Sequence, residues 1–417
     1  MIKFTKPHFY LYILNGLAVA VYFVVFSNLN QNVSHEIVFS TPDALTYMDV
    51  ANWIANGIDS ESVSIRPILY PLILMITTNI GGAYGIWMMQ VLFFILTINF
   101  TFLGIKKLTR SYVFSFLGAI IIMSNLSLIA LTLHALTEVT TVFLLSTMLF
   151  FLSRKINNFR EVSFFHSSLF FLVLLTILKP VFLIPLFGLL FIVFPLFYFE
   201  KYWKRPKSFF KLLLILLPLF IQYSIIKIKY DQTKISLISS LVFSNYFVAK
   251  GIQEIESIDY SKAKIKVKRF SSEDQTNYIV DHMPLYFSLF KKNIIDNITG
   301  KSRFLLYPKG YENNQLAVFM KTYNIKTLKV HYVFIVLVFL LLIILLIKKD
   351  YPTFIFLLFT YSLGAYLIIS TGISFWQGDR LTLPAISIWA FIYPLVLFYY
   401  IKLLYQKLEI DGLSSKS

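Results

Sequence analysis

The chain has 417 residues, of which 57% are hydrophobic and only 14% are charged, and its mean hydropathy is +0.71. A soluble core could not absorb so many apolar residues, and in lipid apolar runs must be helical because no water satisfies their backbone groups. The absence of cysteine excludes disulfides and thiolate chemistry, and the net charge of +17 is better explained by basic flanks of membrane spans than by nucleic-acid binding.

We therefore expect an all-α polytopic membrane protein. Its first apolar run, from Phe9 to about Phe26, has a basic start like a signal peptide. No small-x-small cleavage site follows it, so we interpret it as a retained span. About ten runs are predicted to span the membrane: 9–27, 84–105, 111–131, 137–153, 162–178, 181–199, 208–226, 330–347, 352–370 and 383–401.

The short connections between these runs predict the topology. Lysine and arginine gather in residues 106–110, 154–160, 201–207 and 348–349. With ten spans and a cytoplasmic N-terminus, all four stretches fall on the cytoplasmic side, as the positive-inside rule requires. We therefore expect a multi-pass protein of the cell (inner or plasma) membrane with both termini in the cytoplasm.

This topology divides the chain into three parts. Residues 1–226 form an N-terminal membrane catalytic module with about seven spans and a first outer loop, 28–83. Residues 227–328 form an extracytoplasmic segment with helical stretches at about 236–252 and 275–297, which we expect to fold onto the outer face. Residues 329–417 form a C-terminal membrane module with about three spans.

The first outer loop contains two predicted helices. Residues 43–57 are amphipathic, with Thr41 as the expected N-cap, Pro42 at the first helical position and Gly57 at the end. Residues 66–80 are apolar but too short to span, and a span here would invert every later loop against its charge. We expect an interfacial or re-entrant helix.

Two carboxylates on the expected outer side are candidates for chemistry. Asp43 lies one helical turn before Tyr47, although an acidic residue in the first turn of a helix is also favoured by the helix dipole alone. Glu138 lies close to hydrocarbon, where an acidic residue usually has a functional partner, although it could instead cap its helix. His134 is four residues before Glu138, but a satisfied interfacial histidine is favoured over a metal ligand because no third ligand is apparent.

Three cations stand at span ends on the same side: Arg66, Lys179 and Arg380. Any one of them could extend its side chain to lipid phosphate. Three such cations on one face instead suggest a clamp for phosphate or pyrophosphate.

At these residues the chain resembles the C-type (GT-C) integral-membrane glycosyltransferases. Within them it is similar to the bacterial branch related to protein O-mannosyltransferases and to the aminoarabinose transferase of lipid A (glycosyltransferase family 39/83-like). The similarity lies in Asp43-x-x-x-Tyr47, Arg66-Pro-x-x-Tyr70-Pro, Leu-Thr-Glu138, Leu-Lys179-Pro180, and Gly-Asp379-Arg380 leading into Pro384. The chain departs from the family in having a lone Asp43 before Asp49, and lysine where many members have arginine at position 179.

The resemblance implies transfer of a hexose or pentose from a polyprenyl-phosphate donor to an unidentified acceptor on the extracytoplasmic face. Asp43 would be the catalytic base, and the substrate-binding residues would be Tyr47, Arg66, Tyr70, Glu138, Lys179 and Arg380. No cofactor is required, while a divalent metal held by Asp43 and Glu138 stays open. The remaining alternatives are a surface-polysaccharide polymerase or ligase and, less favoured because we find no internal repeat, a lipid-linked sugar flippase or transporter.

The topology can be tested directly, because a chain without native cysteine reports on any single cysteine introduced into it. We expect an impermeant maleimide to label a cysteine at Ser60 in intact cells. A cysteine at Ser111 should react only after the membrane is opened. Labelling of position 111 but not position 60 in intact cells would invert the topology.

Overall fold

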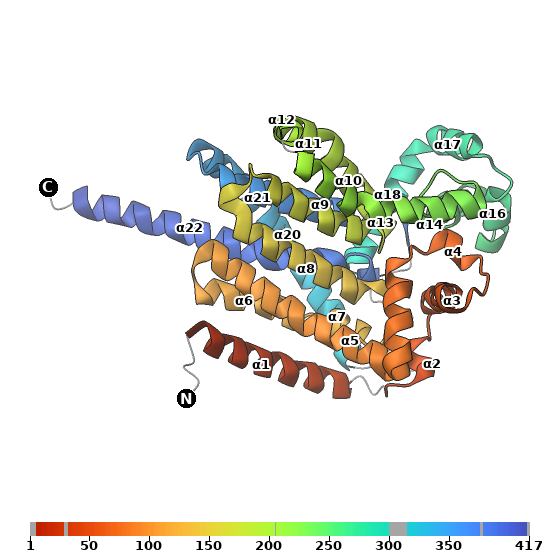
Figure 1. Cartoon of the computed structure of the whole chain (residues 1–417), viewed down its shortest axis with the longest axis horizontal. Helices are drawn as coiled ribbons and strands as arrows, with labels where there is room; N and C mark the ends of the chain where they lie inside the picture. Colours follow the sequence, from red (N-terminus) through yellow and green to blue (C-terminus); the bar gives the residue numbers. More distant parts are fainter. Residues whose placement is uncertain (1–5, 29–31, 205, 300–314, 376–377, 415–417) are drawn as a thin grey trace.

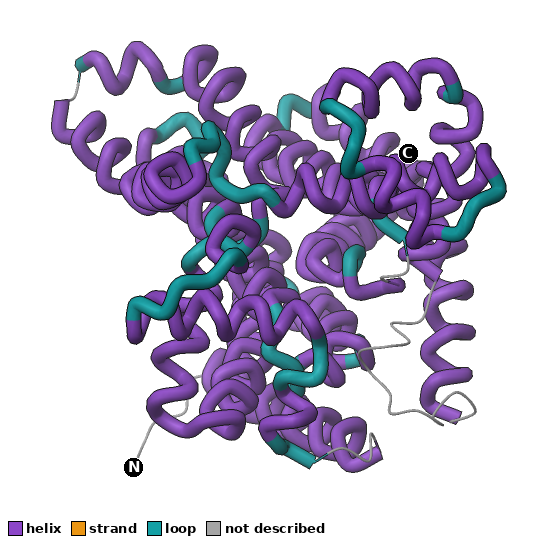
Figure 2. The backbone as a smooth tube through the Cα atoms, turned by 90° about the vertical axis from the view of Figure 1, so that its right-hand side faces the viewer, coloured by secondary structure: helices purple, strands orange, loops and turns teal. Residues whose placement is uncertain are grey.

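The computed structural model describes residues 6–28, 32–204, 206–299, 315–375 and 378–414. Within these ranges every regular element is a helix (Figure 2). The α-helices are α1 (Lys6–Asn28), α2 (His35–Val38), α3 (Pro42–Asn56), α4 (Ser62–Ile65), α5 (Leu69–Thr109), α6 (Tyr112–Met123), α7 (Leu126–Leu131), α8 (Thr137–Lys155), α9 (Val162–Thr176), α10 (Leu183–Gly188), α11 (Phe194–Phe197), α12 (Phe199–Trp203), α13 (Pro206–Tyr230), α14 (Ile238–Val242), α15 (Ala249–Glu256), α16 (Tyr260–Val267), α17 (Ser272–Asp281), α18 (Met283–Thr299), α20 (Gln315–Ile347), α21 (Tyr351–Ile369) and α22 (Ile386–Ser414). Short 3-10 or π segments are η1 (Ile156–Asn158), η2 (Pro180–Phe182), η3 (Leu189–Val193), η4 (Phe243–Val248), η6 (Ser370–Ile373), η7 (Gly378–Arg380) and η8 (Leu383–Ala385).

Eight helical segments of the described chain are long and apolar enough to cross a membrane, so this is a multi-pass α-helical membrane protein. The other two of the ten predicted spans are shorter than expected. The predicted span 111–131 breaks after α6, because the side chain of Asn125 caps α7 by accepting from Leu128 N at 2.8 Å. Helix α6 has 12 residues and rises about 18 Å, which is less than the thickness of the hydrocarbon layer.

The predicted span 162–178 is also short. Helix α9 has 15 residues, which corresponds to about 22 Å, and it ends before the Lys179-Pro180 turn. The count by length is therefore eight spans rather than ten, with α6 and α9 as shorter apolar helices packed among them.

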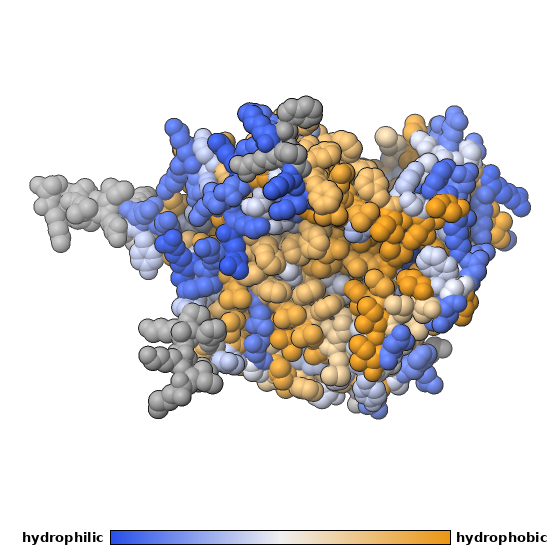
Figure 3. Space-filling view, in the orientation of Figure 1, coloured by the Kyte–Doolittle hydropathy of each residue, from blue (hydrophilic) through white to orange (hydrophobic). Residues whose placement is uncertain are grey.

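Polar residues gather at the two ends of the bundle, with an apolar band between them (Figure 3). The basic connections α5–α6, α8–α9 and α20–α21 lie at one end, together with α12 and the C-terminal part of α22 (Figure 1). Helices α2, α3, α4, α14, α16 and α17 lie at the opposite end, which we call the loop end (residues 32–68 and 231–299). The structure thus brings the basic connections together, as the charge pattern predicts.

Helix α8 is the most buried of the eight spans and packs against α5, α9 and α22. Small polar residues line its contact with α5, where Thr101 Oγ1 donates to Ser146 Oγ at 3.4 Å. Small side chains allow membrane helices to approach closely. Because α8 is held on several sides, its first turn, which carries Glu138, is firmly placed at the loop end.

Both predicted helices of the first loop are present. Thr41 caps α3 by accepting from Ala44 N at 3.1 Å, Pro42 opens the helix, and Gly57 ends it with a left-handed φ of 70°. Residues 69–80 form a separate arm of α5, because Gly81 and Gly82 (φ 56°) leave the helical conformation. Figure 1 shows this arm turning sharply away from the long span that follows it.

Residues 231–299 fold as a helical cap over the loop end. The cap has a small core of its own, made by Val248, Ile252 and Val267, with Tyr286 and Leu289 beside it. It is joined to the first loop, since Ser236 Oγ donates to Ile65 O at 2.7 Å and Leu237 N donates to Ser64 O at 2.8 Å. The predicted helical stretches of this segment are confirmed in the described part, and residues 300–314 lie outside it.

Candidate active site

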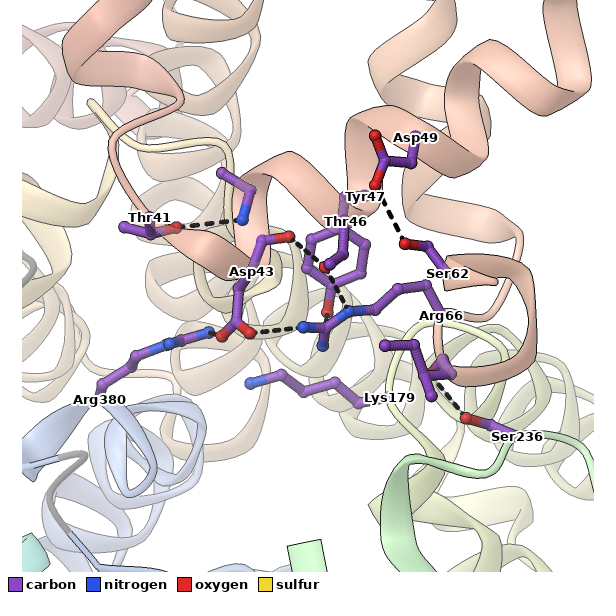
Figure 4. Close-up of polar contacts among 12 residues, drawn as sticks. Thr41, Asp43, Thr46, Tyr47, Asp49, Ser62, Arg66, Lys179, Ser236 and Arg380 are labelled. Atoms are coloured by element: carbon purple, nitrogen blue, oxygen red, sulfur yellow. Dashed lines mark hydrogen bonds and ion pairs between the residues drawn. The ribbon is translucent and has the colours of Figure 1, made fainter. Parts of the chain in front are cut away.

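Five charged side chains meet at the loop end in an alternating series. Glu138 Oε1 accepts from Lys179 Nζ at 2.9 Å and from Arg380 Nε at 2.8 Å. Arg380 Nη2 lies 2.7 Å from Asp43 Oδ2, and Arg66 Nη2 pairs with the other oxygen, Asp43 Oδ1 (Figure 4). We call this series, Lys179–Glu138–Arg380–Asp43–Arg66, the charge chain. Three cations and two carboxylates give it a net charge of +1.

The members of the charge chain come from five separate segments. Asp43 lies in the first turn of α3, and Arg66 follows α4. Glu138 lies in the first turn of α8, and Lys179 precedes η2. Arg380 ends η7, shortly before α22. The first loop and the last inter-helix connection therefore meet at one point, as a shared site for Arg66 and Arg380 requires.

Arg66 is held by contacts that do not depend on Asp43. Its Nε donates to Thr46 Oγ1 at 2.9 Å, and its guanidinium lies over the ring of Tyr47, 4.5 Å from the centroid. Its Nη1 also reaches the Tyr47 hydroxyl at 3.5 Å. Arg66 and Arg380 are 9% and 7% exposed, so both turn inward onto carboxylates rather than outward to lipid phosphate.

Glu138 is fully buried. It does not cap its helix, which was the alternative left open by the sequence, because Leu136 is the N-cap of α8 and Glu138 Oε1 binds two cations. Its position in the first turn also suits the helix dipole. A buried carboxylate of this kind orients the cations around it.

Two buried asparagines that the sequence did not single out hold the segment before Arg380. Asn293 Nδ2 on α18 donates to Gly372 O at 2.9 Å, and Asn297 Nδ2 donates to Ser374 O at 2.8 Å. Both side chains are buried and tie the cap to the segment that leads to Arg380. The sequence did contain a signal for this contact. Asn293 and Asn297 are four residues apart, so they lie on one face of α18, and that face is otherwise apolar.

Gln222 holds the segment that follows Arg66. It is buried in α13, where its Oε1 accepts from Ile68 N at 3.0 Å and its Nε2 donates to Ile235 O at 2.8 Å. One amide thus joins the segment after Arg66 to the start of the cap. A glutamine within a long, mostly apolar run was the sequence signal for this role.

A cavity of about 640 Å³ opens beside the charge chain and is lined by all five of its members. Its opposite wall is apolar and comes from the start of α10 and the end of α21. Ile184 and Ile369 on this wall are 64% and 53% exposed, so the cavity reaches the apolar outer surface of the bundle. The cap covers the cavity with Val242, Tyr246 and Phe290. The cavity is therefore amphiphilic, with a charged end and an apolar exit.

Two other residues singled out by the sequence lie outside this cavity's lining. Tyr70 is fully buried behind Tyr47, with their rings edge to face at 5.1 Å. His134 binds the first loop, with Nδ1 3.1 Å from Ile37 O and 3.3 Å from Ser40 Oγ. Burial lowers the pKa of His134 to about 4, so this histidine is a neutral structural contact. Of the predicted substrate-binding residues, Tyr47, Arg66, Glu138, Lys179 and Arg380 line the cavity, and Tyr70 does not.

The charge of Asp43 is stabilised by its partners. Burial raises the pKa of this carboxyl, but the guanidiniums of Arg380 and Arg66 lower it more, so the net pKa lies well below the ordinary value. The stabilisation is present above the unfolded carboxyl pKa of about 3.9 and is lost as pH falls toward the lower folded pKa. Asp43 is therefore ionised at neutral pH, and while paired it is a weak base.

A divalent metal between Asp43 and Glu138 does not fit these side chains. Both oxygens of Asp43 and one oxygen of Glu138 are already bound to cations. Within the described ranges, no group of three or more histidine, aspartate or glutamate residues could hold a metal ion.

No known protein family, no curated protein and no solved structure matches this chain. The chemistry of the site rests on its own side chains. A cavity with cations at one end and an apolar exit at the other suits a ligand that joins an anionic headgroup to a hydrophobic tail.

Glu138→Gln should strongly destabilise the folded protein, because it leaves Lys179 and Arg380 without their shared carboxylate. Breaking a buried ion pair costs roughly 3–5 kcal/mol. In the double variant Glu138→Gln/Lys179→Met, part of the loss should be recovered, since one of the two unpaired cations is removed. Thermal unfolding in detergent measures both effects.

The control is Glu200→Gln, which removes an exposed partner of Lys204. Little change is expected there, because exposed pairs contribute little to stability. Equal effects of Glu138→Gln and Glu200→Gln would show that the charge chain does not stabilise the fold.

Proposed function

We propose that this protein is a membrane glycosyltransferase with a GT-C-like architecture. It transfers a sugar from a polyprenyl-phosphate donor to an acceptor, with Asp43 as the general base. The observation that carries the proposal is a cavity that is lined both by the charge chain and by apolar side chains reaching the apolar outer surface of the bundle. The resemblance to GT-C glycosyltransferases described above also supports the proposal, since it rests on the order along the chain of the motifs around Asp43, Arg66, Glu138, Lys179 and Arg380.

The charge of the site favours a phosphodiester. A sugar linked to a polyprenyl monophosphate carries one negative charge, which balances the net +1 of the charge chain. A pyrophosphate-linked sugar would bring two negative charges to the same cations. The guanidinium groups of Arg66 and Arg380 suit phosphate oxygens because their paired N–H groups match the spacing of those oxygens.

The apolar exit suits the prenyl chain. Leu183, Ile184 and Leu367 line this side of the cavity, and Ile184 faces outward from the bundle. A prenyl chain can leave the cavity between α10 and α21 and remain in the bilayer. The donor then never has to leave the membrane to place its phosphate beside the cations.

The reaction is a direct displacement. The acceptor oxygen bonds to the anomeric carbon, and the bond from that carbon to the phosphate oxygen breaks. The acceptor proton passes to Asp43, and the bonding electron pair leaves with the polyprenyl phosphate, which gains one negative charge. Lys179, Arg380 and Arg66 would stabilise that growing charge, and the ion pairs of Glu138 with Lys179 and Arg380 support this role.

The cap supplies the remaining side of the site. Tyr246 and Phe290 of the cap line the cavity. Aromatic faces of this kind suit a sugar ring or an apolar acceptor. We propose that the loop end faces the outside of the cell and that residues 231–299 help to bind the acceptor.

Asp43→Asn should reduce sugar transfer about 100-fold or more, because the amide cannot take the acceptor proton. The measurement is release of polyprenyl phosphate by protein in nanodiscs supplied with a panel of polyprenyl-phosphate sugars and with an extract of bacterial envelope as the source of the acceptor. Asp49→Asn is the matched control, since Asp49 lies on the same helix but is not a member of the charge chain. Its carboxylate accepts a hydrogen bond from Ser62 Oγ at 3.0 Å. Near-normal transfer by Asp43→Asn would refute the role of Asp43.

Arg66→Lys and Arg380→Lys should each keep a cation but weaken use of the donor, with KM rising about tenfold. Each arginine binds two partners through different nitrogens, Arg66 to Thr46 and Asp43, and Arg380 to Glu138 and Asp43. One ammonium group cannot reproduce that geometry. Arg154→Lys, at the basic end of α8, should leave KM unchanged. Unchanged KM in all three variants would contradict the proposed clamp.

A further inference from the structure

Asp43 is held as a bound phosphate would be held. Its two oxygens face two guanidiniums from distant parts of the chain, Oδ1 toward Arg66 and Oδ2 toward Arg380 (Figure 4). Guanidinium groups bind carboxylates and phosphates in the same way, through N–H groups aimed at neighbouring oxygens. The carboxylate therefore occupies the cation-lined position that an anionic ligand would need.

The two arginines would keep their positions without Asp43. Arg66 remains bonded to Thr46 through Nε and packed on the ring of Tyr47. Arg380 remains bonded to Glu138 through its own Nε at 2.8 Å. Each guanidinium thus has an anchor other than Asp43, so the pair of cations is preformed for a second anion.

Asp43 is also the carboxylate able to leave. Its side chain lines the cavity and is 32% exposed, whereas the side chain of Glu138 is 1% exposed. Asp43 lies in the first turn of α3, but the N-cap hydrogen bond of this helix is made by Thr41. Rotation of the Asp43 side chain therefore leaves that hydrogen bond intact. Glu138 is enclosed and stays with Lys179 and Arg380.

We propose that Asp43 is an internal competitor for the phosphate site: the donor's phosphate displaces this carboxylate from Arg66 and Arg380, and the displacement frees it to act as the base. This inference rests on the proposed function. No covalent bond changes in the exchange, since one anion replaces another on the same two cations.

The exchange couples donor binding to basicity. While Asp43 is paired with both guanidiniums, its pKa lies well below the ordinary carboxyl value. Once the phosphate takes those guanidiniums, the nearby negative charge favours protonation of the carboxylate. The base is then strongest when a donor is present beside it.

The proposal predicts opposite effects on binding and on transfer. In Asp43→Asn the competing carboxylate is gone, so a polyprenyl monophosphate without sugar should bind about ten times more tightly. This factor corresponds to a wild-type protein in which Asp43 leaves the two arginines free about one-tenth of the time. Transfer by the same variant should be lost. A purely structural role would weaken both, and a role as base alone would leave binding unchanged.

The measurement is the Kd of polyprenyl monophosphate for the full chain in phosphatidylcholine nanodiscs. Polyprenol without phosphate should bind equally to wild type and Asp43→Asn, because it brings no anion. Inorganic phosphate separates recognition of the headgroup alone from recognition of the lipid-linked group. If it also binds Asp43→Asn more tightly, the same exchange serves free phosphate.

Two controls and a second variant make the test decisive. Asp49→Asn makes the same chemical change on the same helix and should leave the Kd unchanged, and Asp43→Glu keeps a carboxylate and should not tighten binding. Asp43→Ser also removes the charge and serves if Asp43→Asn does not fold. Equal or weaker binding of polyprenyl monophosphate by a folded Asn or Ser variant would overturn the proposal.

The result also separates this inference from the proposed function. Tighter binding by Asp43→Asn, with no sugar transferred by wild type from any donor, would support the exchange and refute the glycosyltransferase. Sugar transfer by wild type with unchanged binding by Asp43→Asn would refute the exchange and leave the glycosyltransferase standing.

Discussion

The arrangement of the loop end depends on the mutual neutralisation of five charges at the edge of an apolar bundle. A charge placed there without a partner costs several kcal/mol, because it loses water and gains no compensating contact. Glu138, which is fully buried, is tolerated only with Lys179 and Arg380 beside it, and Arg380 also pairs with Asp43. Each member of the charge chain therefore constrains the position of the next.

This constraint joins parts of the chain that are far apart in sequence. Arg380 comes from the connection before the last span, whereas Asp43 and Arg66 come from the first loop. Neutral hydrogen bonds strengthen the same junction, with Gln222 fixing the segment after Arg66 and two asparagines of α18 fixing the segment before Arg380. The contacts that close the fold at this end are thus also the contacts that shape the cavity. The cations that stabilise this end of the fold are the same ones that we propose bind the donor.

The net charge of +1 on the charge chain indicates the kind of ligand that the site suits. An alternating series that begins and ends with a cation leaves +1 to be balanced, and the cavity beside it continues into an apolar wall. An anion attached to a lipid satisfies both conditions at once. The cap of residues 231–299 adds the apolar side chains of Val242 and Phe290 to the lining of the cavity, and electrostatic interactions are stronger beside apolar surface than in water.

Local signals in the sequence were sufficient for much of the fold. Apolar run length predicted the spans, and Thr41, Pro42 and Gly57 predicted α3, because capping and helix termination depend on residues within about one turn of each other. The break at Asn125 and the short α9 shortened two predicted spans, since a polar cap or a Lys-Pro turn outweighs average hydropathy. The sequence also indicated the charged candidates at the loop end. Only the tertiary structure decided that Asp43 pairs with both Arg66 and Arg380, that Tyr70 lies behind Tyr47, and that asparagines of α18 hold the last connection. Such contacts join distant segments and follow no periodicity, so they exist only once the helices have packed.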